Sequence, residues 1–504
     1  MASPAPRSVF IRLDARAGDP LQTRIYESIR LAILEGVLAP GSRLTSSRAL
    51  AVELGVSRTT ALLALEQLTA EGYLTARRGS GTYVSEDLPD DLPRRRVPPA
   101  GGEPRHPPIS RRAAAQAIIP RLARRCPGPP RVFRLGVPAL DLFPMRQWSQ
   151  MVSRRLRSLT LSQIDYGHPA GVPALREAIA AHVQSARGTR CTPDQIVIVA
   201  GSQRGVELTC DIALDHGDEA WMEEPGYAGM RSALIRSGAR ILTAPVDGEG
   251  LVVDTVTRHG GNARLVCVTP SHQFPTGVPL SLPRRLALLR WASAARAWIL
   301  EDDYDSEYRY GARPVPCLHG LDVDGRVIYV GSFSKTLFPA IRLGFLIVPA
   351  DLQETILGIR HTSDQHPPVL EQAVLADFMA GGHYERHLRR MRSASRERLE
   401  AMADAARRFC GGVLRVRPVH SGLHAVADLD ESAPADIVSR EAWNRGVEVM
   451  PLSGYFQSSP CTVNGLVLGF APIRPEAMAP GMERLAAAIE AGRAAGRRET
   501  RRRA

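Results

Sequence analysis

The sequence predicts an α/β protein with two folded regions separated by a proline-rich segment. Three observations support this prediction. Residues 20–84 show a helical spacing of apolar residues followed by a hairpin-like pattern, and residues 85–130 are rich in proline, which sustains neither a helix nor an inner strand. From residue 131 to about residue 490, short apolar runs alternate with stretches of helical length, a pattern typical of helices packed around a mostly parallel sheet.

The N-terminal region begins with a helix whose apolar residues recur every four positions, namely Leu21, Ile25, Ile29 and Ile33. The stretch "TSSRALAVELG" then predicts a second, short helix that ends at Gly55. A third helix is expected to begin after Ser57, a residue that caps helices well, and its buried face to contain Ala61, Leu65 and Leu68. Two helices joined by a short glycine turn are typical of a helix-turn-helix, whose second helix enters the DNA major groove by its N-terminal end.

The segment "YLTARRGSGTYV" (73–84) predicts two strands joined by a glycine turn. Arg77 and Arg78 stand beside flexible glycines that let the backbone approach a phosphate or a groove, so we interpret the hairpin as a wing. The alternative for the whole region is a small helical dimerisation domain. The order of the three helices, two of them with serine and arginine at their starts, followed by the arginine-glycine hairpin, favours DNA binding.

This region resembles the GntR family of winged-helix regulators, through "SSRALAVELGVSRTTALLALEQLTAEGYL" followed by "GSGTYV". The resemblance implies a winged helix-turn-helix DNA-binding domain at residues 15–85, with double-stranded DNA as its partner. The DNA-binding residues that it implies are Arg48, Ser57, Arg58, Thr59, Thr60, Arg77, Arg78, Gly79 and Gly81. Thr45 stands where the family usually has proline, a change expected to alter only the start of a loop.

Seven apolar runs in the large region are predicted to be strands, because each is short and bounded by turn residues. They are "QIVIVAG" (195–201), "EAWMEEP" (219–225), "ARILTAP" (239–245), "RLVCVTP" (264–270), "RAWILEDD" (296–303), "RVIYVGS" (326–332) and "RLGFLIVP" (342–349). Most are separated by helical lengths, which predicts helices between parallel strands. Residues 86–130, with basic clusters among their prolines, are expected to form a linker between the two regions.

The composition is that of an ordinary globular protein, with 44% hydrophobic and 23% charged residues. The formal charge of +12 suggests a polyanionic partner, and the basic tail at 493–504 is expected to be a solvated, disordered end. Seven scattered cysteines without a C-x-x-C pair argue against a disulfide framework and a structural zinc site, so no metal is expected. The N-terminus lacks the apolar core of a signal peptide and no stretch is long enough to span a membrane, so we expect a soluble, cytoplasmic protein.

The stretch "VGSFSKTLFPAIRLGF" (330–345) carries groups that suit a phosphorylated cofactor. An apolar strand delivers Ser332, Ser334 and Lys335, and Arg342 follows seven residues after the lysine. A phosphate needs hydroxyls, a cation with directed donors and preferably a helix N-terminus. A lysine beside it can form a Schiff base with an aldehyde. Pyridoxal 5′-phosphate (PLP) carries both groups on one ring, so we expect it to be the cofactor.

The other parts of a PLP site follow along the chain. The run "WILEDDYDSEY" places Asp302 at the end of a buried strand, as a carboxylate that keeps the pyridine nitrogen protonated, with Tyr304 near the ring hydroxyl. The run "VAGSQRGVEL" opens a helix at Ser202 and Gln203, a second phosphate contact. The run "EEPGYAG" supplies Tyr227, an aromatic that could stack on the ring. Each residue alone has an ordinary alternative, such as a helix cap or a packed loop position, and the prediction depends on their combination.

Residues 131–492 resemble fold-type I, class I aminotransferases, and the whole chain resembles the MocR subfamily of GntR regulators. The motifs "TPSHQFPTGVPLSLPRR", "EDDYDSEYRY" and "GSFSKTLFPAIRLGFLIVP" carry this resemblance. It implies an aminotransferase-like, PLP-binding sensor domain with a mostly parallel sheet, a smaller C-terminal α+β subdomain and dimerisation. By this resemblance Lys335 is the Schiff-base lysine and Asp302 the pyridinium partner. Tyr166, in "YGHPAG", would then reach the phosphate bound by the partner subunit.

Two departures from the aminotransferases bear on the ligand. Phe274 stands where they usually have the asparagine of N-P-T-G, and His272 and Gln273 are candidates to replace its hydrogen bond to the ring hydroxyl. The stretch "CTVNGLVLGFAPIRP" has no arginine before its glycine, where aminotransferases place one for the substrate carboxylate, and Arg474 lies just beyond. The assumption that the effector is an ordinary α-amino acid is therefore open to question.

We therefore predict a PLP-dependent transcriptional regulator, in which PLP itself or an amine or amino-acid effector changes DNA binding through aldimine exchange at Lys335. The expected partners are the effector, a second copy of the chain and a DNA operator with two half-sites. The chain is expected to regulate rather than to catalyse, with at most a residual aminotransferase half-reaction. The alternative is an active PLP-dependent aminotransferase with an appended DNA-binding module, and turnover of an amino donor with a keto acid separates the two.

Overall fold

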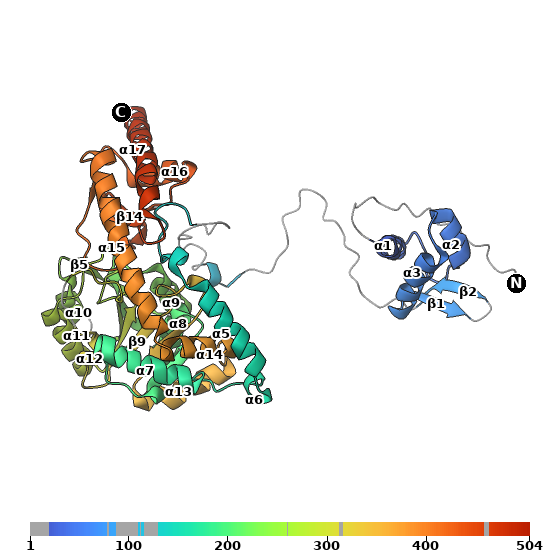
Figure 1. Ribbon diagram of the computed structural model, residues 1–504, viewed down its shortest axis with the longest axis horizontal. Helices are drawn as coiled ribbons and strands as arrows, with labels where there is room; N and C mark the ends of the chain where they lie inside the picture. Colours follow the sequence, from blue (N-terminus) through green and yellow to red (C-terminus); the bar gives the residue numbers. More distant parts are fainter. Residues whose placement is uncertain are drawn as a thin grey trace. The chain divides into compact units, whose positions relative to one another are not determined.

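The computed structural model describes the chain between residues 20 and 503 with several gaps. The described residues are 20–77, 80–86, 109–110, 112–114, 130–259, 261–311, 316–457 and 463–503. The chain divides into two compact units, Met1–Pro108 and Ile109–Ala504 (Figure 1). Among the helices of these described ranges, none is long and apolar enough to cross a membrane.

The N-terminal unit has the predicted order of three helices and a hairpin. Its elements are α1 (Leu21–Leu34), α2 (Ser47–Leu54), α3 (Arg58–Ala70), β1 (Leu74–Arg77) and β2 (Gly81–Val84). The two strands pair antiparallel, with Leu74 opposite Val84. The periodicity correctly identified the buried residues of α1 and α3, with the exception of Leu21. Leu21 is 47% exposed because it is the first residue of α1 and lies outside the core that the three helices share.

Serine side chains begin both helices of the helix-turn-helix. Ser46 Oγ accepts a hydrogen bond from Ala49 N at 3.2 Å, and Ser57 Oγ accepts one from Thr60 N at 3.1 Å. Gly55 ends α2 in the left-handed conformation. Each of these signals acts on a backbone group only a few residues away in the chain. The predicted starts of the two helices and the predicted end of α2 therefore agree with the structure.

An eight-stranded sheet forms the centre of the large unit, in the order β3-β10-β9-β8-β7-β4-β5-β6. The strands are β3 (Ile196–Val199), β4 (Glu219–Glu224), β5 (Arg240–Asp247), β6 (Gly250–Leu251), β7 (Ala263–Val268), β8 (Trp298–Asp303), β9 (Val327–Ser332) and β10 (Gly344–Ile347). Each of the seven predicted runs overlaps one of them, although β5 extends two residues beyond its run and β7 begins one residue before its run. The sheet is mostly parallel, as predicted, but β10 pairs antiparallel with both β3 and β9, and β6 pairs antiparallel with β5.

Helices cover both faces of this sheet. The first face is covered by α5 (Met145–Ser158), α7 (Pro173–Arg187), α10 (Val253–His259), α11 (Leu282–Ala295), α12 (Leu318–Leu321) and α14 (Val369–Ala380). The second face is covered by α8 (Ser202–Ala213), α9 (Ala228–Ser237) and α13 (Gln353–Thr362). Within β3, Ile196 and Ile198 pack in the hydrophobic core beneath α5, α7 and α14, whereas Val197 and Val199 pack in the core beneath α8 and α9. A strand buried on both faces reads as a continuous apolar run, which is how the sequence presented it.

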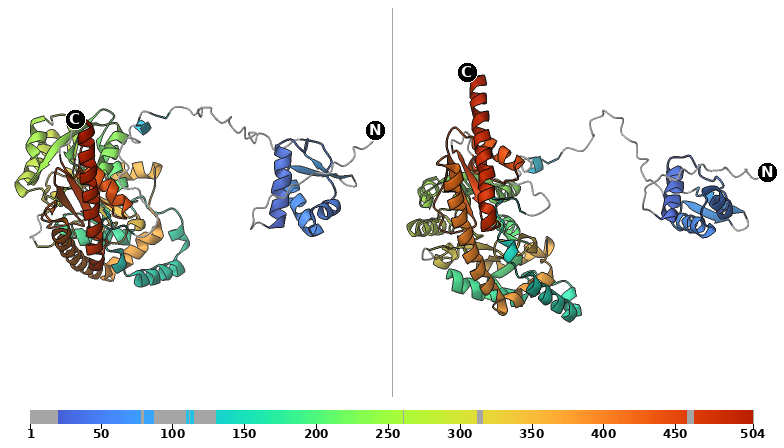
Figure 2. Two further views of the ribbon diagram at one scale, coloured as in Figure 1. Left: turned by 90° about the horizontal axis from the view of Figure 1, so that it is seen from above. Right: turned by 45° about the horizontal axis from the view of Figure 1, so that its top comes forward.

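A smaller subdomain follows, with a four-stranded antiparallel sheet in the order β11-β12-β14-β13. Its elements are β11 (Leu414–Val416), β12 (His424–Leu429), β13 (Met450–Pro451), β14 (Gly465–Gly469), α15 (His383–Cys410), α16 (Ala435–Asn444) and α17 (Pro475–Arg503). The long helices α15 and α17 lie side by side in all views (Figures 1 and 2). The expected C-terminal α+β subdomain is thereby confirmed.

The C-terminal helix extends further than the sequence suggested. The structure continues α17 to Arg503, so the prediction of a disordered tail at 493–504 is wrong. Arg493 Nε donates a hydrogen bond to Ser432 Oγ at 2.9 Å, and Gly492 lies against Val438 of α16. These contacts anchor the helix beyond the point where its apolar pattern ends, which a charge count cannot reveal.

Part of the proline-rich segment belongs with the large unit. Residues 112–114 form a helical turn, and Arg112 Nη1 donates a hydrogen bond to Arg236 O at the end of α9, at 3.2 Å. Most of the predicted linker at 86–130 lies outside the described residues, so its boundaries stay predictions.

Candidate functional site

A cavity of about 490 Å³ opens at the carboxyl ends of the parallel strands, next to the C-terminal sheet. Nine of the residues predicted from sequence line it: Ser202, Gln203, Tyr227, Asp302, Tyr304, Ser332, Ser334, Lys335 and Arg342. They lie at or just after the ends of β3, β4, β8 and β9, except Arg342, which precedes β10. The tertiary structure thus brings together all but one of the residues proposed for the cofactor, and Tyr166 is the exception.

Lys335 follows β9, and its side chain reaches the backbone of a segment that lies 199 residues earlier in the chain. Its Nζ donates a hydrogen bond to Gly136 O at 2.8 Å. Gly136 has φ +72°, a conformation that favours glycine, and a Cβ there would lie 2.9 Å from the lysine nitrogen. Lys335 is also the only lysine in the chain. The other members of its 64 lysines and arginines are all arginines.

Four buried carboxylates end β8 and the turn that follows, namely Glu301, Asp302, Asp303 and Asp305. Glu301, Asp303 and Asp305 have protein partners, which are respectively backbone N–H groups, a guanidinium at 3.0 Å and an imidazole at 3.1 Å. Asp302 lines the cavity, and its Oδ1 is buried with no hydrogen-bond partner among the described residues. Burial, reinforced by the neighbouring Asp303, raises the pKa of Asp302 to about 7. Such a carboxylate suits a cationic ring nitrogen in the cavity.

An anion subsite lies at the start of α8. Gly201 precedes the helix with φ +88°, which brings the first N–H groups of α8 to the cavity, and a Cβ there would meet the Arg342 guanidinium at 3.3 Å. Arg342 Nη2 donates a hydrogen bond to Ala200 O at 2.9 Å, which holds the guanidinium beside this turn. The hydroxyls of Ser332 and Ser334 come from the end of β9. Hydroxyls, a guanidinium and a helix N-terminus are the groups that bind a phosphate.

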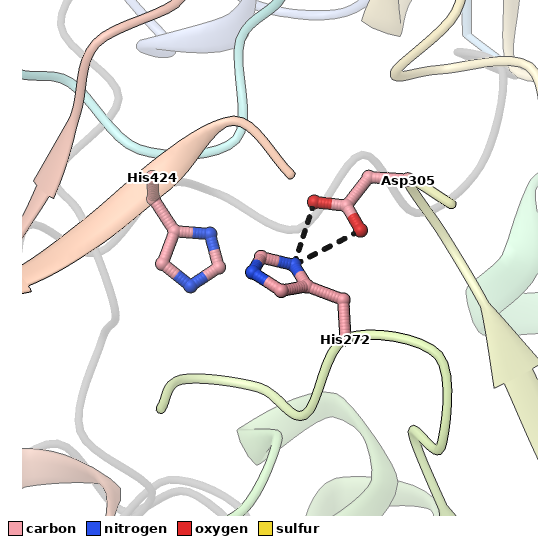
Figure 3. A group of neighbouring side chains, drawn as sticks. All are labelled: His272, Asp305 and His424. Atoms are coloured by element: carbon pink, nitrogen blue, oxygen red, sulfur yellow. Dashed lines mark hydrogen bonds and ion pairs between the residues drawn. The ribbon is translucent and has the colours of Figure 1, made fainter. Parts of the chain in front are cut away.

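A chain of buried groups stands behind Tyr304. Its hydroxyl lies 3.0 Å from His272 Nδ1, and the same nitrogen lies 3.1 Å from both carboxylate oxygens of Asp305. Figure 3 shows His272 between Asp305 and His424. Burial raises the pKa of Tyr304 well above its usual value, so the hydroxyl keeps its proton and can donate it to an oxygen in the cavity.

His272, Asp305 and His424 also lie close enough together to be considered as metal ligands. Within the described part of the chain, hydrogen bonds already account for these side chains. His272 Nδ1 faces Asp305 and Tyr304, and His424 Nε2 donates to Pro275 O at 3.0 Å. We therefore interpret the group as a support for Tyr304 that the sequence analysis had not recognised.

Neither candidate replaces the missing asparagine directly. Gln273 does not line the cavity, because its Nε2 donates to Pro225 O at 2.8 Å and its Oε1 accepts from Thr276 Oγ1 at 2.7 Å. His272 contacts the hydroxyl of Tyr304 instead. Phe274 lines the cavity itself, with its ring edge-on to Tyr227 at 5.7 Å between centroids.

Arg474, the arginine considered from sequence for binding a substrate carboxylate, does not line the cavity. Its side chain is 68% exposed, and its Nε donates to Asp141 Oδ2 at 3.0 Å. On β14, Val467 is fully buried in an apolar cluster. Arg134, which the sequence analysis did not consider, lines the cavity.

Tyr166 lies on the surface, 83% exposed and outside the cavity of its own chain. It follows α6 (Leu161–Ile164) closely, and the neighbouring stretch of chain carries further exposed apolar residues, which are Leu156, Leu161 and Ile164. A cluster of large exposed apolar side chains is typical of an interaction surface.

The predicted DNA-binding residues gather at the start of α3, on α2 and on the hairpin. Arg48, Arg58 and Thr59 are exposed, as is the capping residue Ser57, whereas Thr60 is half-buried. Thr60 is tied to Ser57, with 2.8 Å between the two hydroxyl oxygens. The exposed start of α3 therefore presents N–H groups and a guanidinium together, as groove and phosphate binding require.

The wing is described only in part. Arg77 lies over the Tyr83 ring at 5.0 Å and pairs with Glu86 at 3.3 Å, while Gly81 lies beside the guanidinium of Arg43. Arg78 and Gly79 lie outside the described residues. Arg43 is a further basic residue of this hairpin that the sequence analysis missed, because its position beside the wing depends on the fold.

Comparisons with known proteins agree with this architecture. Residues 21–84 match the family described as bacterial regulatory proteins, gntR family, and residues 132–459 match the family described as aminotransferase class I and II. The chain is 38% identical to the probable rhizopine catabolism regulatory protein MocR of Rhizobium meliloti, over 95% of each chain. It is 33% identical to the pyridoxine biosynthesis transcriptional regulator PdxR of Corynebacterium glutamicum, over 91% of this chain and 94% of the relative.

Among solved structures, the chain resembles LysN, an α-aminoadipate aminotransferase of Thermus thermophilus complexed with N-(5′-phosphopyridoxyl)-L-leucine. The TM-score is 0.65 and the identity 29%, over 71% of this chain and 92% of LysN. The cofactor that this fold family implies is PLP, and the cavity fits it. Asp302 Oδ1 lacks a hydrogen-bond partner among the described residues, and the anion subsite and a lysine line the same cavity. The chain therefore belongs to the MocR-like GntR regulators, which join a GntR helix-turn-helix to a class I/II aminotransferase-like domain.

Proposed function

We propose that this regulator senses an amine or amino acid through exchange at Lys335 and transmits the result to DNA bound by the winged helix. The observation that carries the proposal is the single lysine of the chain, placed in a cavity built for PLP. Arginine supplies charge everywhere else, but a guanidinium cannot condense with an aldehyde, so position 335 requires an amine for its chemistry.

PLP supplies an aldehyde that condenses reversibly with primary amines. Asp302 would hold its ring nitrogen, and the start of α8 with Arg342 would hold its phosphate. Tyr304, supported by His272, would donate a hydrogen bond to the ring hydroxyl. An effector amine that took the place of Lys335 would leave its Nζ as a free amine, and a free Nζ donates a hydrogen bond to Gly136 O, in the segment that leads back toward the linker.

DNA binding in this proposal requires two copies of the chain. The exposed apolar residues around Tyr166 support a dimer formed through α5 and α6, in which Tyr166 reaches the phosphate site of the partner subunit. Two winged helices then occupy two half-sites of an operator in the bacterial cytoplasm. A tethered second module can raise the apparent affinity by about 10² to 10⁴ over one module.

The test uses full-length protein with bound PLP. Borohydride reduction followed by peptide mass mapping should place the cofactor on Lys335, and the Lys335→Ala variant should lose the visible absorbance of the linked cofactor. Amines should then no longer change operator binding by the variant, whereas they should change it for the wild type. A reduced cofactor at the N-terminal amine, or an amine response in the variant, would remove Lys335 from the sensing role.

The alternative function, an active aminotransferase, predicts multiple turnovers of an amino donor with a keto acid. Phe274 in place of the asparagine, and the absence of an arginine on β14, favour the regulator. Stoichiometric conversion at most, measured by product formation against protein concentration, is the expected result. Sustained turnover would favour the enzyme.

A further inference from the structure

Among the described residues that line the cavity, three carry a lysine or arginine charge, and one of them has no part in the function proposed above. Lys335 is assigned to the aldehyde and Arg342 to the phosphate. The third is Arg134, which enters the cavity two residues before Gly136. Its one ion pair within the described chain is a long contact with Glu448, 3.8 Å from Nε to Oε1. The guanidinium therefore keeps N–H groups for a ligand.

The backbone around Arg134 runs beside the strand that carries the carboxylate arginine in aminotransferases. Phe133 O accepts a hydrogen bond from Gly469 N of β14 at 2.8 Å, and Val132 O accepts one from Glu448 N at 2.9 Å. Gly469 carries no side chain, and a Cβ there would collide with Arg134 O at 2.1 Å. The segment thus brings a guanidinium to the edge of β14, while β14 itself has none.

Glu448 is the ion-pair partner of this guanidinium, at 3.8 Å between Nε and Oε1. Its side chain is 5% exposed, against 15% for Arg134, and it is absent from the lining of the cavity. Burial raises the pKa of Glu448, and the nearby Arg134 and Arg131 oppose that rise. A buried carboxylate at this distance attracts the guanidinium without accepting a hydrogen bond from it, so the N–H groups of Arg134 remain for a second anion.

We propose that Arg134 binds the acidic group of the effector, in place of the missing arginine of β14, and that Glu448 is its positioning residue. This inference rests on the proposed exchange at Lys335. The effector is then a primary amine that also carries a carboxylate or a sulfonate. A charge-assisted hydrogen bond from Arg134 should favour such a compound over a neutral amine of equal length by roughly 10- to 150-fold.

The experiment titrates full-length, PLP-loaded protein with matched amines and follows the visible spectrum. The probes are glycine, β-alanine, 4-aminobutyrate and taurine, each against the unsubstituted alkylamine of the same carbon length. The wild type should respond to at least one acidic amine at a concentration ten or more times lower than to its neutral match. Carboxylate and sulfonate probes of equal length show which acid the site accepts.

Substitutions assign the preference to a residue. Arg134→Gln should abolish it while the response to neutral amines stays within about threefold, and Arg134→Lys should keep part of it. Glu448→Gln should weaken it less than Arg134→Gln, because the positive charge remains. Arg474→Gln, an exposed arginine of the same subdomain, is the matched control and should change nothing.

Two outcomes overturn the inference in distinguishable ways. A preference for acidic amines that survives Arg134→Gln, in protein that keeps the PLP spectrum and the melting temperature of the wild type, removes Arg134 from the binding role. A wild type that responds to no amine at all refutes the exchange at Lys335, and the inference with it. Equal responses of the wild type to acidic and neutral amines refute the inference alone.

Discussion

The buried carboxylate of Asp302 allows a prediction in which one substitution has opposite effects on the empty and the cofactor-bound protein. Burial raises its pKa from 3.8 to about 7. A rise of about three pH units corresponds to a penalty of about 4 kcal/mol for the charged carboxylate in the folded, PLP-free protein. Asp302→Asn removes the charge at nearly constant shape. The PLP-free variant should therefore be more stable than the wild type at neutral and higher pH.

The sign of the pH dependence follows from the raised pKa. The folded wild type binds a proton at Asp302 more tightly than the unfolded chain does, so this residue's contribution is most favourable below pH 3.8 and is lost as the pH rises through 7. The stability advantage of Asp302→Asn should thus grow between pH 4 and pH 7, by up to about 4 kcal/mol. Chemical denaturation of both PLP-free proteins at several pH values measures it.

Cofactor binding should change in the opposite direction. A charge-assisted hydrogen bond to the ring nitrogen is worth roughly 1.5–3 kcal/mol, so Asp302→Asn should weaken PLP binding about tenfold or more. Asp303→Asn on the same strand is the matched control, since Asp303 pairs with Arg187 at 3.0 Å and its loss leaves a buried cation without that partner. That variant should be less stable than the wild type, because Arg187 then keeps Glu307, at 3.2 Å, as its one remaining ion-pair partner among the described residues. Wild-type PLP affinity in Asp302→Asn, or a loss of stability in its PLP-free form above pH 7, would refute the assignment.

Three further predictions concern other parts of the molecule. Arg58→Ala should weaken binding to the cognate operator by about 1–3 kcal/mol. Arg77→Ala should weaken binding to all DNA similarly and lower the salt slope by about one, because the exposed ion pair of Arg77 with Glu86 is too weak to keep it from a phosphate. Salt titrations on operator and random duplexes distinguish the two variants, and equal behaviour of both contradicts the assignment. Replacing Leu161 and Ile164, 82% and 65% exposed, by lysine should weaken the dimer by roughly 3 kcal/mol or more, seen as monomers in analytical ultracentrifugation; an intact dimer places the interface elsewhere. Burial lowers the pKa of His387 to about 4. The stability of the wild type relative to His387→Gln should therefore fall by up to about 3 kcal/mol as the pH drops from 6.5 to 4, and the contributions of other titrating groups cancel in this comparison. A stability difference that stays constant over this pH range in denaturation experiments would show that burial does not keep His387 neutral.

The cofactor site shows where prediction from sequence succeeded and where it stopped. The stretch around Lys335 places hydroxyls, an amine and an arginine within a few residues, and such local groupings survive folding nearly unchanged. Asp302 was placed from its position at the end of a buried strand and by the family resemblance, but three further buried acidic residues stand at the end of β8 and in the turn that follows. The structure supplies the physical reason: within the part of the chain that it describes, each of the other three carboxylates has at least one protein partner, whereas Asp302 lines the cavity with a buried Oδ1 that has none.

The sequence by itself determined the helix-turn-helix, because caps, glycine stops and four-residue periodicity act between neighbours in the chain. It also determined the positions of the seven strands, since each apolar run is short and ends at turn residues. The presence of one lysine in the chain is a property of the sequence as well, and it marks the residue on which the proposed chemistry depends.

Only the tertiary structure decided which distant residues meet. The antiparallel direction of β10 follows from a connection after β9 that contains no α-helix, and the long α17 follows from contacts with α16. Arg134 and Glu448 are more than 300 residues apart, and no local pattern links them. They come together because the start of the large unit lies along β14, where backbone hydrogen bonds and a side-chain-free glycine admit it.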